Sequence, residues 1–143
     1  MQTAYNENMA VAVIGELVDD TNRRIESMFA ENAFDPGDAV QLGTTDNQCE
    51  TVAASVYGVA INNPTKEMGL TGGSVYANKD SLSVLTAGRI WVAVDGAVAK
   101  DAQAYWDVAA GAFNSTSSGN IAVTGGAFKT TTTGAGMAIL EIK

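Results

Sequence analysis

Few residues in this chain of 143 amino acids could carry out chemistry. It contains no histidine, so the commonest general base and the commonest metal ligand of proteins are both missing. Ser–His–Asp and Cys–His nucleophile arrangements are therefore excluded, as are zinc sites built on histidine and cysteine. The single cysteine, Cys49, lies between Asp46 and Glu50, and neighbouring acids raise a thiol pKa, which opposes nucleophilic reactivity. We expect a structural thiol and no intrachain disulfide.

Acidic groups and glycines offer no better candidates. Asp19-Asp20 and Asp35 with Asp38 lack the spacing of a calcium loop, and Ca²⁺ requires about six to eight oxygen ligands. Gly134-Ala135-Gly136 has no room for the helix that must follow a phosphate-binding loop. No spacing of carboxylates indicates a glycosidase pair. The sequence therefore predicts no catalytic residue, no cofactor and no metal ion.

Two tryptophans, Trp91 and Trp106, are the remaining candidates for binding. An exposed tryptophan on a β-protein can stack on a sugar or anchor a protein interface, and a buried one packs in the core. Trp91 alternates with aliphatic residues and shares its strand face with Arg89 and Asp95. We therefore regard Trp91 as a candidate interface residue. A carbohydrate-binding or fibre-like module using Trp91, Trp106 and Tyr105 remains an alternative.

The element that would position Trp91 is the alternating apolar run from Gly88 to Gly96. Ile90, Val92 and Val94 face one way in this run, and a period of two is typical of a half-buried strand. Glycines at both ends should close the strand. Other short runs predict further strands, at Met9–Ile14, Ala39–Leu42, Thr51–Ile61, Val75–Lys79, Gly96–Val98, Gln103–Trp106, Ile121–Thr124, Ala127–Thr130 and Met137–Lys143. Arg23–Ala30 fits a strand or a helix, and we favour a strand because its neighbours are strand-like.

Glycine and aspartate punctuate these runs. Asp35-Pro36-Gly37-Asp38 is a strong turn, and Gly58 inside its run predicts a bulge or a close approach of backbone. Asp38, Asp80 and Asp101 each precede a strand, where an aspartate carboxylate can accept a backbone N–H. No amphipathic helix of three turns or more is evident.

These patterns predict an all-β fold, a compact antiparallel β-sandwich or barrel of short strands with an extended N-terminal arm. Residues 1–20 would form the arm and the first strand, and residues 21–143 a single β-domain. A chain of this length is large enough to bury a sizeable core.

The formal net charge of −8 is unevenly distributed. Ten of the sixteen acidic residues lie between Met1 and Glu50, against only Arg23 and Arg24. An acidic chain without a basic patch is a poor nucleic-acid binder, so we expect a protein partner. No basic residue precedes Arg23, and Met9–Ile14 is far shorter than the roughly 20 residues that span a bilayer. We therefore expect no export signal and no membrane association.

Several strand and turn segments recur in a characteristic order: Ile25–Ala30 and Asp35–Val40 in the front half, then Gly58-Val59-Ala60, Asp80–Val92, Ala102–Tyr105, Gly126-Ala127-Phe128 and Ala138–Ile142. In this order they resemble the structural cement, or decoration, proteins of tailed-phage heads. The resemblance covers most of the chain and consists of strand and turn patterns without a catalytic signature. Lys100-Asp101-Ala102 departs from the Gly-Asp/Glu-Pro that the family often has there, which leaves the type of that turn open.

The resemblance implies a non-enzymatic protein that binds the outer surface of the mature, expanded phage capsid. It would clamp neighbouring subunits of the major capsid (coat) protein, commonly as a trimer at threefold or quasi-threefold positions, after synthesis in the host bacterial cytoplasm. From the charge asymmetry we expect the capsid or subunit contact on the N-terminal arm around Tyr5 and Met9 and on an acidic edge from Glu16 to Glu26 that faces basic coat residues. The candidate residues are Tyr5, Met9, Glu16, Asp19, Asp20, Arg23, Arg24 and Trp91.

Overall fold

The computed structural model describes residues 13–20, 22–63 and 75–143. Across these residues the chain is all-β and has no helix, as the sequence predicted. The strands are β1 (Arg24–Ala30), β2 (Ala39–Leu42), β3 (Gln48–Thr51), β4 (Gly58–Ala60), β5 (Ser81–Val94), β6 (Gln103–Asp107), β7 (Ala112–Asn114), β8 (Ile121–Phe128) and β9 (Gly136–Ile142).

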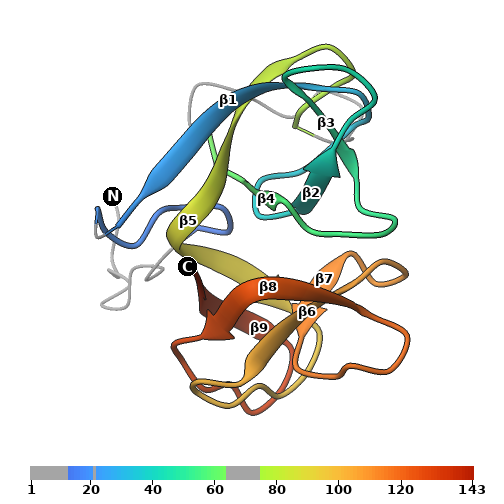
Figure 1. Cartoon of the computed structure of the whole chain (residues 1–143). Helices are drawn as coiled ribbons and strands as arrows, with labels where there is room; N and C mark the ends of the chain where they lie inside the picture. Colours follow the sequence, from blue (N-terminus) through green and yellow to red (C-terminus); the bar gives the residue numbers. More distant parts are fainter. Residues whose placement is uncertain (1–12, 21, 64–74) are drawn as a thin grey trace, which may run out of the picture.

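Strand pairing forms two closed circuits that share β5 (Figure 1). In the N-terminal circuit the order is β1-β3-β2-β4-β5, and β5 pairs back onto β1. In the C-terminal circuit the order is β5-β7-β6-β8-β9, and β9 pairs back onto β5. Most pairs are antiparallel, as predicted, but β1–β3 and β5–β7 are parallel, so the sheet is mixed. Closed circuits of this kind leave few strand edges exposed to other chains.

The central strand β5 is longer than the sequence predicted. The prediction that Gly88 closes the strand is wrong, because β5 runs through it from Ser81 to Val94. Gly88 has a φ of 127°, which an L-residue rarely adopts, and there β5 changes its antiparallel partner from β1 to β9. The predicted alternation is confirmed, since Ile90, Val92 and Val94 are buried.

Glycine also misled the prediction in β8. Gly125 and Gly126 were expected to turn between two strands, but β8 continues through both as one strand. Gly125 has a φ of 73°, and the pairing register of β6 with β8 shifts between Gln103 and Tyr105. The glycines therefore accompany an irregularity inside the strand pairing rather than a turn between two strands.

The Thr51–Ile61 run is not one strand. Thr51 is the last residue of β3 and Gly58–Ala60 form β4, while the residues between them and Ile61 lie outside any strand. The close approach at Gly58 is confirmed, because a Cβ there would lie 2.6 Å from the carbonyl oxygen of Leu85. Gly96–Val98 and Val75–Lys79 are also not strands: Val98 makes a single bridge to Thr132, and Tyr76 a single bridge to Phe34. Of the predicted strand Met9–Ile14, only Val13 and Ile14 are described, and neither is in a strand.

The larger hydrophobic core spans both circuits. Val59 and Leu85 of the N-terminal circuit belong to the same buried cluster as Ile90, Phe128 and Leu140 of the C-terminal circuit. A second cluster fills the N-terminal circuit around Phe34, Val40, Cys49, Tyr76 and Val84. On the predicted face of β9, Ala138, Leu140 and Ile142 are all buried. The shared core holds the two circuits together where β5 passes between them.

Candidate functional site

The described part of the predicted N-terminal arm lies along β5. Gly15 N–H donates to the carbonyl oxygen of Trp91 at 2.8 Å, and Trp91 N–H donates to Glu16 O at 3.0 Å. Val18 N–H donates to Arg89 O at 3.1 Å, and Leu17 forms a bridge with Ile90. The structure therefore brings together two of the candidate contact residues, Glu16 and Trp91. We call residues 13–20 the β5-bound segment.

A tight contact with the Asp35–Asp38 turn fixes the beginning of this segment. Gly15 and Gly37 have φ angles of 86° and 84°. A Cβ on Gly15 would lie 2.6 Å from Pro36 Cβ, and a Cβ on Gly37 would overlap the side chain of Ile14. Asn62 N–H also donates to Gly15 O at 2.8 Å. Only glycine permits two backbones to approach so closely, so the turn and the segment form one unit.

The same turn contains a carboxyl group with a perturbed pKa. Asp38 Oδ2 accepts the backbone N–H of Asp35 at 2.9 Å, as predicted for an aspartate before a strand. Burial raises the pKa of Asp38 to about 6, partly offset by this hydrogen bond. Asp80 accepts the N–H of Ala77 in the same manner, whereas the carboxylate of Asp101 binds Lys129. The carboxyl group of Asp38 therefore stabilises the turn through its hydrogen bond, and it titrates at a pH of about 6.

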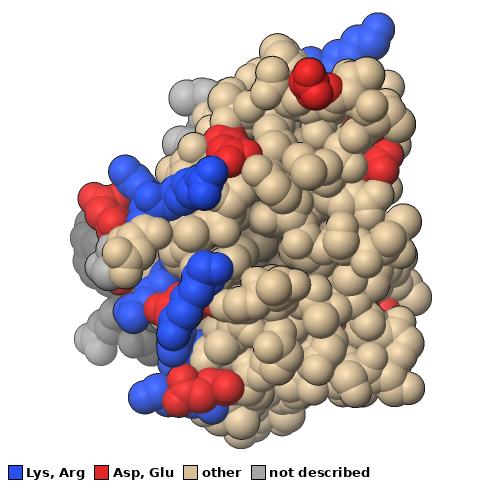
Figure 2. Space-filling view, in the orientation of Figure 1, with Lys and Arg blue, Asp and Glu red and all other residues tan. Residues whose placement is uncertain are grey.

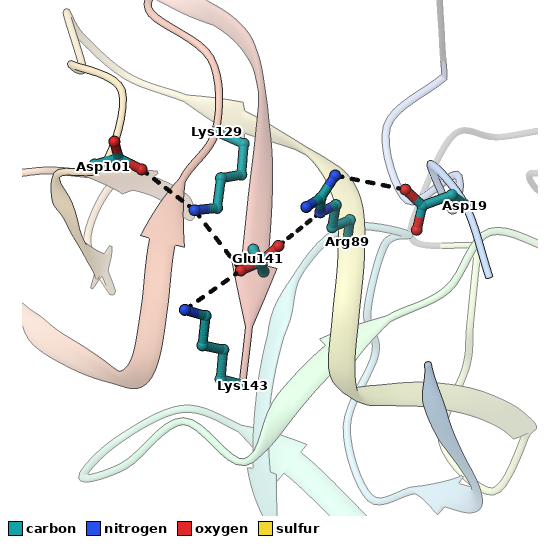
Figure 3. Close-up of polar contacts among 6 residues, drawn as sticks. All are labelled: Asp19, Arg89, Asp101, Lys129, Glu141 and Lys143. Atoms are coloured by element: carbon teal, nitrogen blue, oxygen red, sulfur yellow. Dashed lines mark hydrogen bonds and ion pairs between the residues drawn. The ribbon is translucent and has the colours of Figure 1, made fainter. Parts of the chain in front are cut away.

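An ion-pair network connects the β5-bound segment to the C-terminal circuit (Figure 3). Arg89 on β5 contacts Asp19 at 3.6 Å and Glu141 on β9 at 2.6 Å. Glu141 also lies 3.7 Å from Lys129 Nζ, which contacts Asp101 at 3.2 Å, and Lys143 Nζ is 3.9 Å from Glu141. The side chain of Glu141 is only 14% exposed. Its hydrogen bond from Arg89 lowers the pKa of Glu141, so the group is a carboxylate at neutral pH.

The acidic edge is less negative than its carboxylates alone imply. Asp20 forms an ion pair with Arg23 at 2.6 Å, and Arg24 contacts Glu26 at 3.5 Å. Asp20 remains 83% exposed and Arg24 74% exposed, so both pairs lie in solvent and contribute little to stability. Charged side chains gather along one margin of the molecule in Figure 2, and much of the rest of that face is uncharged.

Not all the candidate contact residues can be placed. Tyr5 and Met9 lie outside the described residues. Glu16, Asp20, Arg23 and Arg24 are exposed, while Asp19 and Trp91 are partly buried at β5. The pairing of Arg89 with Glu141 was not predicted, because the two residues are 52 positions apart and no local pattern connects them.

The tryptophans differ in exposure. Trp106 is only 6% exposed and packs edge-on against Phe113, with ring centroids 4.8 Å apart. It is thus a core residue rather than a surface for stacking sugars. Trp91 is half-buried, with its backbone held by the β5-bound segment. The carbohydrate-binding alternative therefore loses one of its three platforms.

The described residues contain no group of three or more potential metal-ligating side chains. Within the same residues, no helix is long and apolar enough to cross a membrane. Cys49 is buried. Its burial, and to a lesser extent the nearby negative charge of Glu31, raises the pKa of its thiol to about 11. The thiolate that a nucleophile requires is therefore strongly disfavoured.

Within the described residues the fold is all-β, and residues 13–20 are hydrogen-bonded to the central strand β5. The family model described as "Structural cement protein (E217 gp24/Pam3 gp6)" matches residues 1–143. The chain therefore belongs to the structural cement proteins, a family of structural proteins and not of enzymes. This confirms the resemblance found in the sequence.

A solved structure agrees in fold. A chain of the structure titled "The capsid of Myoviridae Phage XM1" superimposes with a TM-score of 0.79 and 19% sequence identity, covering 100% of this chain and 97% of that chain. No curated protein sequence matches the chain. Membership of the phage structural cement family supports a capsid-stabilising structural role and a location in the virion, and the structural neighbour shares the fold.

Proposed function

We propose that this protein binds the outer surface of the mature, expanded capsid and clamps neighbouring coat subunits together. The observation that carries the proposal is the anchoring of the β5-bound segment, through Gly15, Glu16 and Val18, onto the strand shared by both circuits. A clamp must transmit force from its contact surface to a rigid body. These backbone hydrogen bonds, with the Arg89 network, connect the segment to the shared core.

The proposed contact surface consists of the N-terminal arm and the edge beside it. Its residues are Tyr5, Met9, Glu16, Asp19, Asp20, Arg23, Arg24 and Trp91. The edge from Glu16 to Glu26 contains four acids (Glu16, Asp19, Asp20 and Glu26) and two arginines, so it is net negative, which favours a basic coat surface. In the proposed organisation residues 1–20 act as the arm and residues 21–143 as the body.

Mass action supplies the mechanism. A ligand that binds the expanded shell more tightly than the unexpanded or dissociated coat protein stabilises the expanded state by its difference in affinity, at every site. We place the protein as a homotrimer at threefold or quasi-threefold positions, where one assembly contacts several coat subunits. It would be synthesised in the host bacterial cytoplasm and join the shell after expansion.

Co-sedimentation tests this function. Purified protein is mixed with expanded shells and with unexpanded precursor shells of the phage, and bound protein is quantified against concentration. We expect saturable binding to expanded shells only, with a copy number that identifies the occupied symmetry positions. A variant lacking residues Met1–Asn8 should bind more weakly. Equal binding by this variant would exclude the arm, and no binding to either shell would contradict the proposal.

A further inference from the structure

The outer face of β1 is an exposed apolar surface that no described segment covers. Ile25 is 39% exposed and Phe29 is 51% exposed, and Ser27 between them is also exposed. The alternate residues Met28 and Ala30 point inward and are buried. Ile25 and Phe29 therefore present two large apolar side chains to solvent on one face of the strand.

The order of residues along this face is self-complementary. Every second residue reads Arg23, Ile25, Ser27, Phe29 and Glu31, that is basic, apolar, small, apolar and acidic; Arg23 and Glu31 lie one residue beyond the two ends of β1. A twofold rotation about Ser27 exchanges the apolar positions with each other and the basic end with the acidic end. Such exchange is the requirement for an isologous contact between two identical subunits.

The neighbouring strand leaves room for close approach. On β5, Ser83 pairs with Ser27 and Ser81 pairs with Phe29, and both β5 serines are exposed. These small side chains do not obstruct a second sheet face. The existing partners of the end groups also permit a further contact. Arg23 pairs with Asp20, and Glu31 accepts hydrogen bonds from Thr44, but a guanidinium has five N–H donors and a carboxylate about four acceptor sites.

We propose that two copies of this chain pair through the outer face of β1, around a twofold axis at Ser27. Ile25 of each copy packs against the partner's Phe29, and Arg23 faces the partner's Glu31. Because the face has a basic residue at one end and an acidic residue at the other, a second copy in the opposite orientation matches its charges, which favours a second copy over an unrelated protein as the partner. This twofold contact is separate from the contacts within the proposed trimer. On a shell it would join copies that belong to trimers at neighbouring threefold or quasi-threefold positions. It is testable in the free protein, independently of capsid binding.

Sedimentation equilibrium over a range of concentrations gives the first test. We expect monomers and dimers in exchange, and Phe29→Ser should raise the dissociation constant about tenfold or more, because a buried aromatic anchor is lost from both copies. Val108→Ser is the matched control, since Val108 is 53% exposed but lies beyond β6, in the C-terminal circuit. Its dissociation constant should equal that of the wild type.

Charge exchange tests the orientation. Arg23→Glu and Glu31→Arg should each weaken association, and the double variant should restore it, because every contact then has its opposite partner again. If Arg23 and Glu31 only stabilise the monomer, the double variant should not regain association. Failure of the double variant to restore association would contradict the twofold arrangement.

Cross-linking tests the axis, in solution and on shells. Ser27→Cys places a thiol at the axis in each copy, so a short bifunctional thiol reagent should produce covalent dimers. Cys49 is buried and should not react, and Ser115→Cys, in an exposed loop of the C-terminal circuit, is the control. No excess of dimers over this control, in either setting, would overturn the proposal. If Phe29→Ser lost shell binding while its self-association stayed equal to that of the wild type, the face would be a coat contact and the proposal would be overturned.

Discussion

Substituting Gly15 tests whether the β5-bound segment is firmly attached to the body. An alanine at φ +86° costs about 1–2 kcal/mol in the left-handed region. Its Cβ would also lie 2.6 Å from Pro36 Cβ and 2.9 Å from Gly37 N, so the segment or the turn must move. Such a shift weakens the hydrogen bonds of Gly15 with Trp91 and Asn62, at about 1 kcal/mol each.

The unfolded chain partly offsets this cost. Replacing glycine by alanine reduces the entropy of the unfolded state, which is worth about 0.4–1 kcal/mol in favour of folding. We therefore expect Gly15→Ala to lower the free energy of unfolding by about 2 kcal/mol in urea titrations. The amide of Trp91, which donates to Glu16, should also exchange faster with solvent.

Gly96→Ala is the matched control. No atom lies within 4 Å of a Cβ at Gly96, and its φ is outside the left-handed region. This variant should be as stable as the wild type or slightly more stable. If the two variants unfold with free energies within about 0.5 kcal/mol of each other, the segment is not held as the structure indicates.

Three further predictions concern ionisable groups. Glu141→Gln should lower stability by about 1–2 kcal/mol at pH 7. The hydrogen bond from Arg89 lowers the pKa of Glu141 below 4.5, so the stability that the carboxylate contributes is present above pH 4.5 and is lost as pH falls through the folded-state pKa. If the stability difference between Glu141→Gln and the wild type persists in acid, the network is contradicted. The pH dependence of stability that Asp38 contributes has the opposite sign. Its folded-state pKa of about 6 exceeds 3.8, so stability should rise as pH falls from 6 towards 3.8, as urea midpoints would show. Asp38→Asn should abolish this gain, and an equal gain in the variant would refute the assignment. The thiol of Cys49 should react with alkylating reagents at pH 8 only on unfolding, because its pKa is about 11; rapid reaction of the folded protein would contradict its burial.

The fold class could be predicted from the sequence because side-chain alternation is a local property. The period of two placed Ile90, Val92 and Val94 on the buried face of β5, and β2 lies where the pattern indicated. The pattern alone did not separate strand from helix in β1, which was assigned from its strand-like neighbours. Glycine was the main source of error. Gly88 and Gly125 resemble strand ends in sequence, but each lies within a strand at a positive φ. Whether a glycine ends a strand or bends it depends on partners distant in sequence.

The candidate site was less predictable for the same reason. The charge asymmetry indicated an acidic edge, but it did not indicate that Arg23 and Arg24 form ion pairs within it. The contact of Gly15 with the Pro36–Gly37 turn joins segments about twenty residues apart. Trp91 and Trp106 look alike in sequence, and only the packing of Phe113 against Trp106 separates a core residue from a candidate for contact.

Thermal disassembly of expanded shells tests the central claim most directly. Shells are heated alone and with increasing amounts of the protein, and disassembly is followed by light scattering or calorimetry. The proposed clamp predicts a rise in disassembly temperature that increases with occupancy and levels off when binding saturates. Unexpanded precursor shells should show no change. Saturable binding that leaves the disassembly temperature of expanded shells unchanged would contradict a stabilising role.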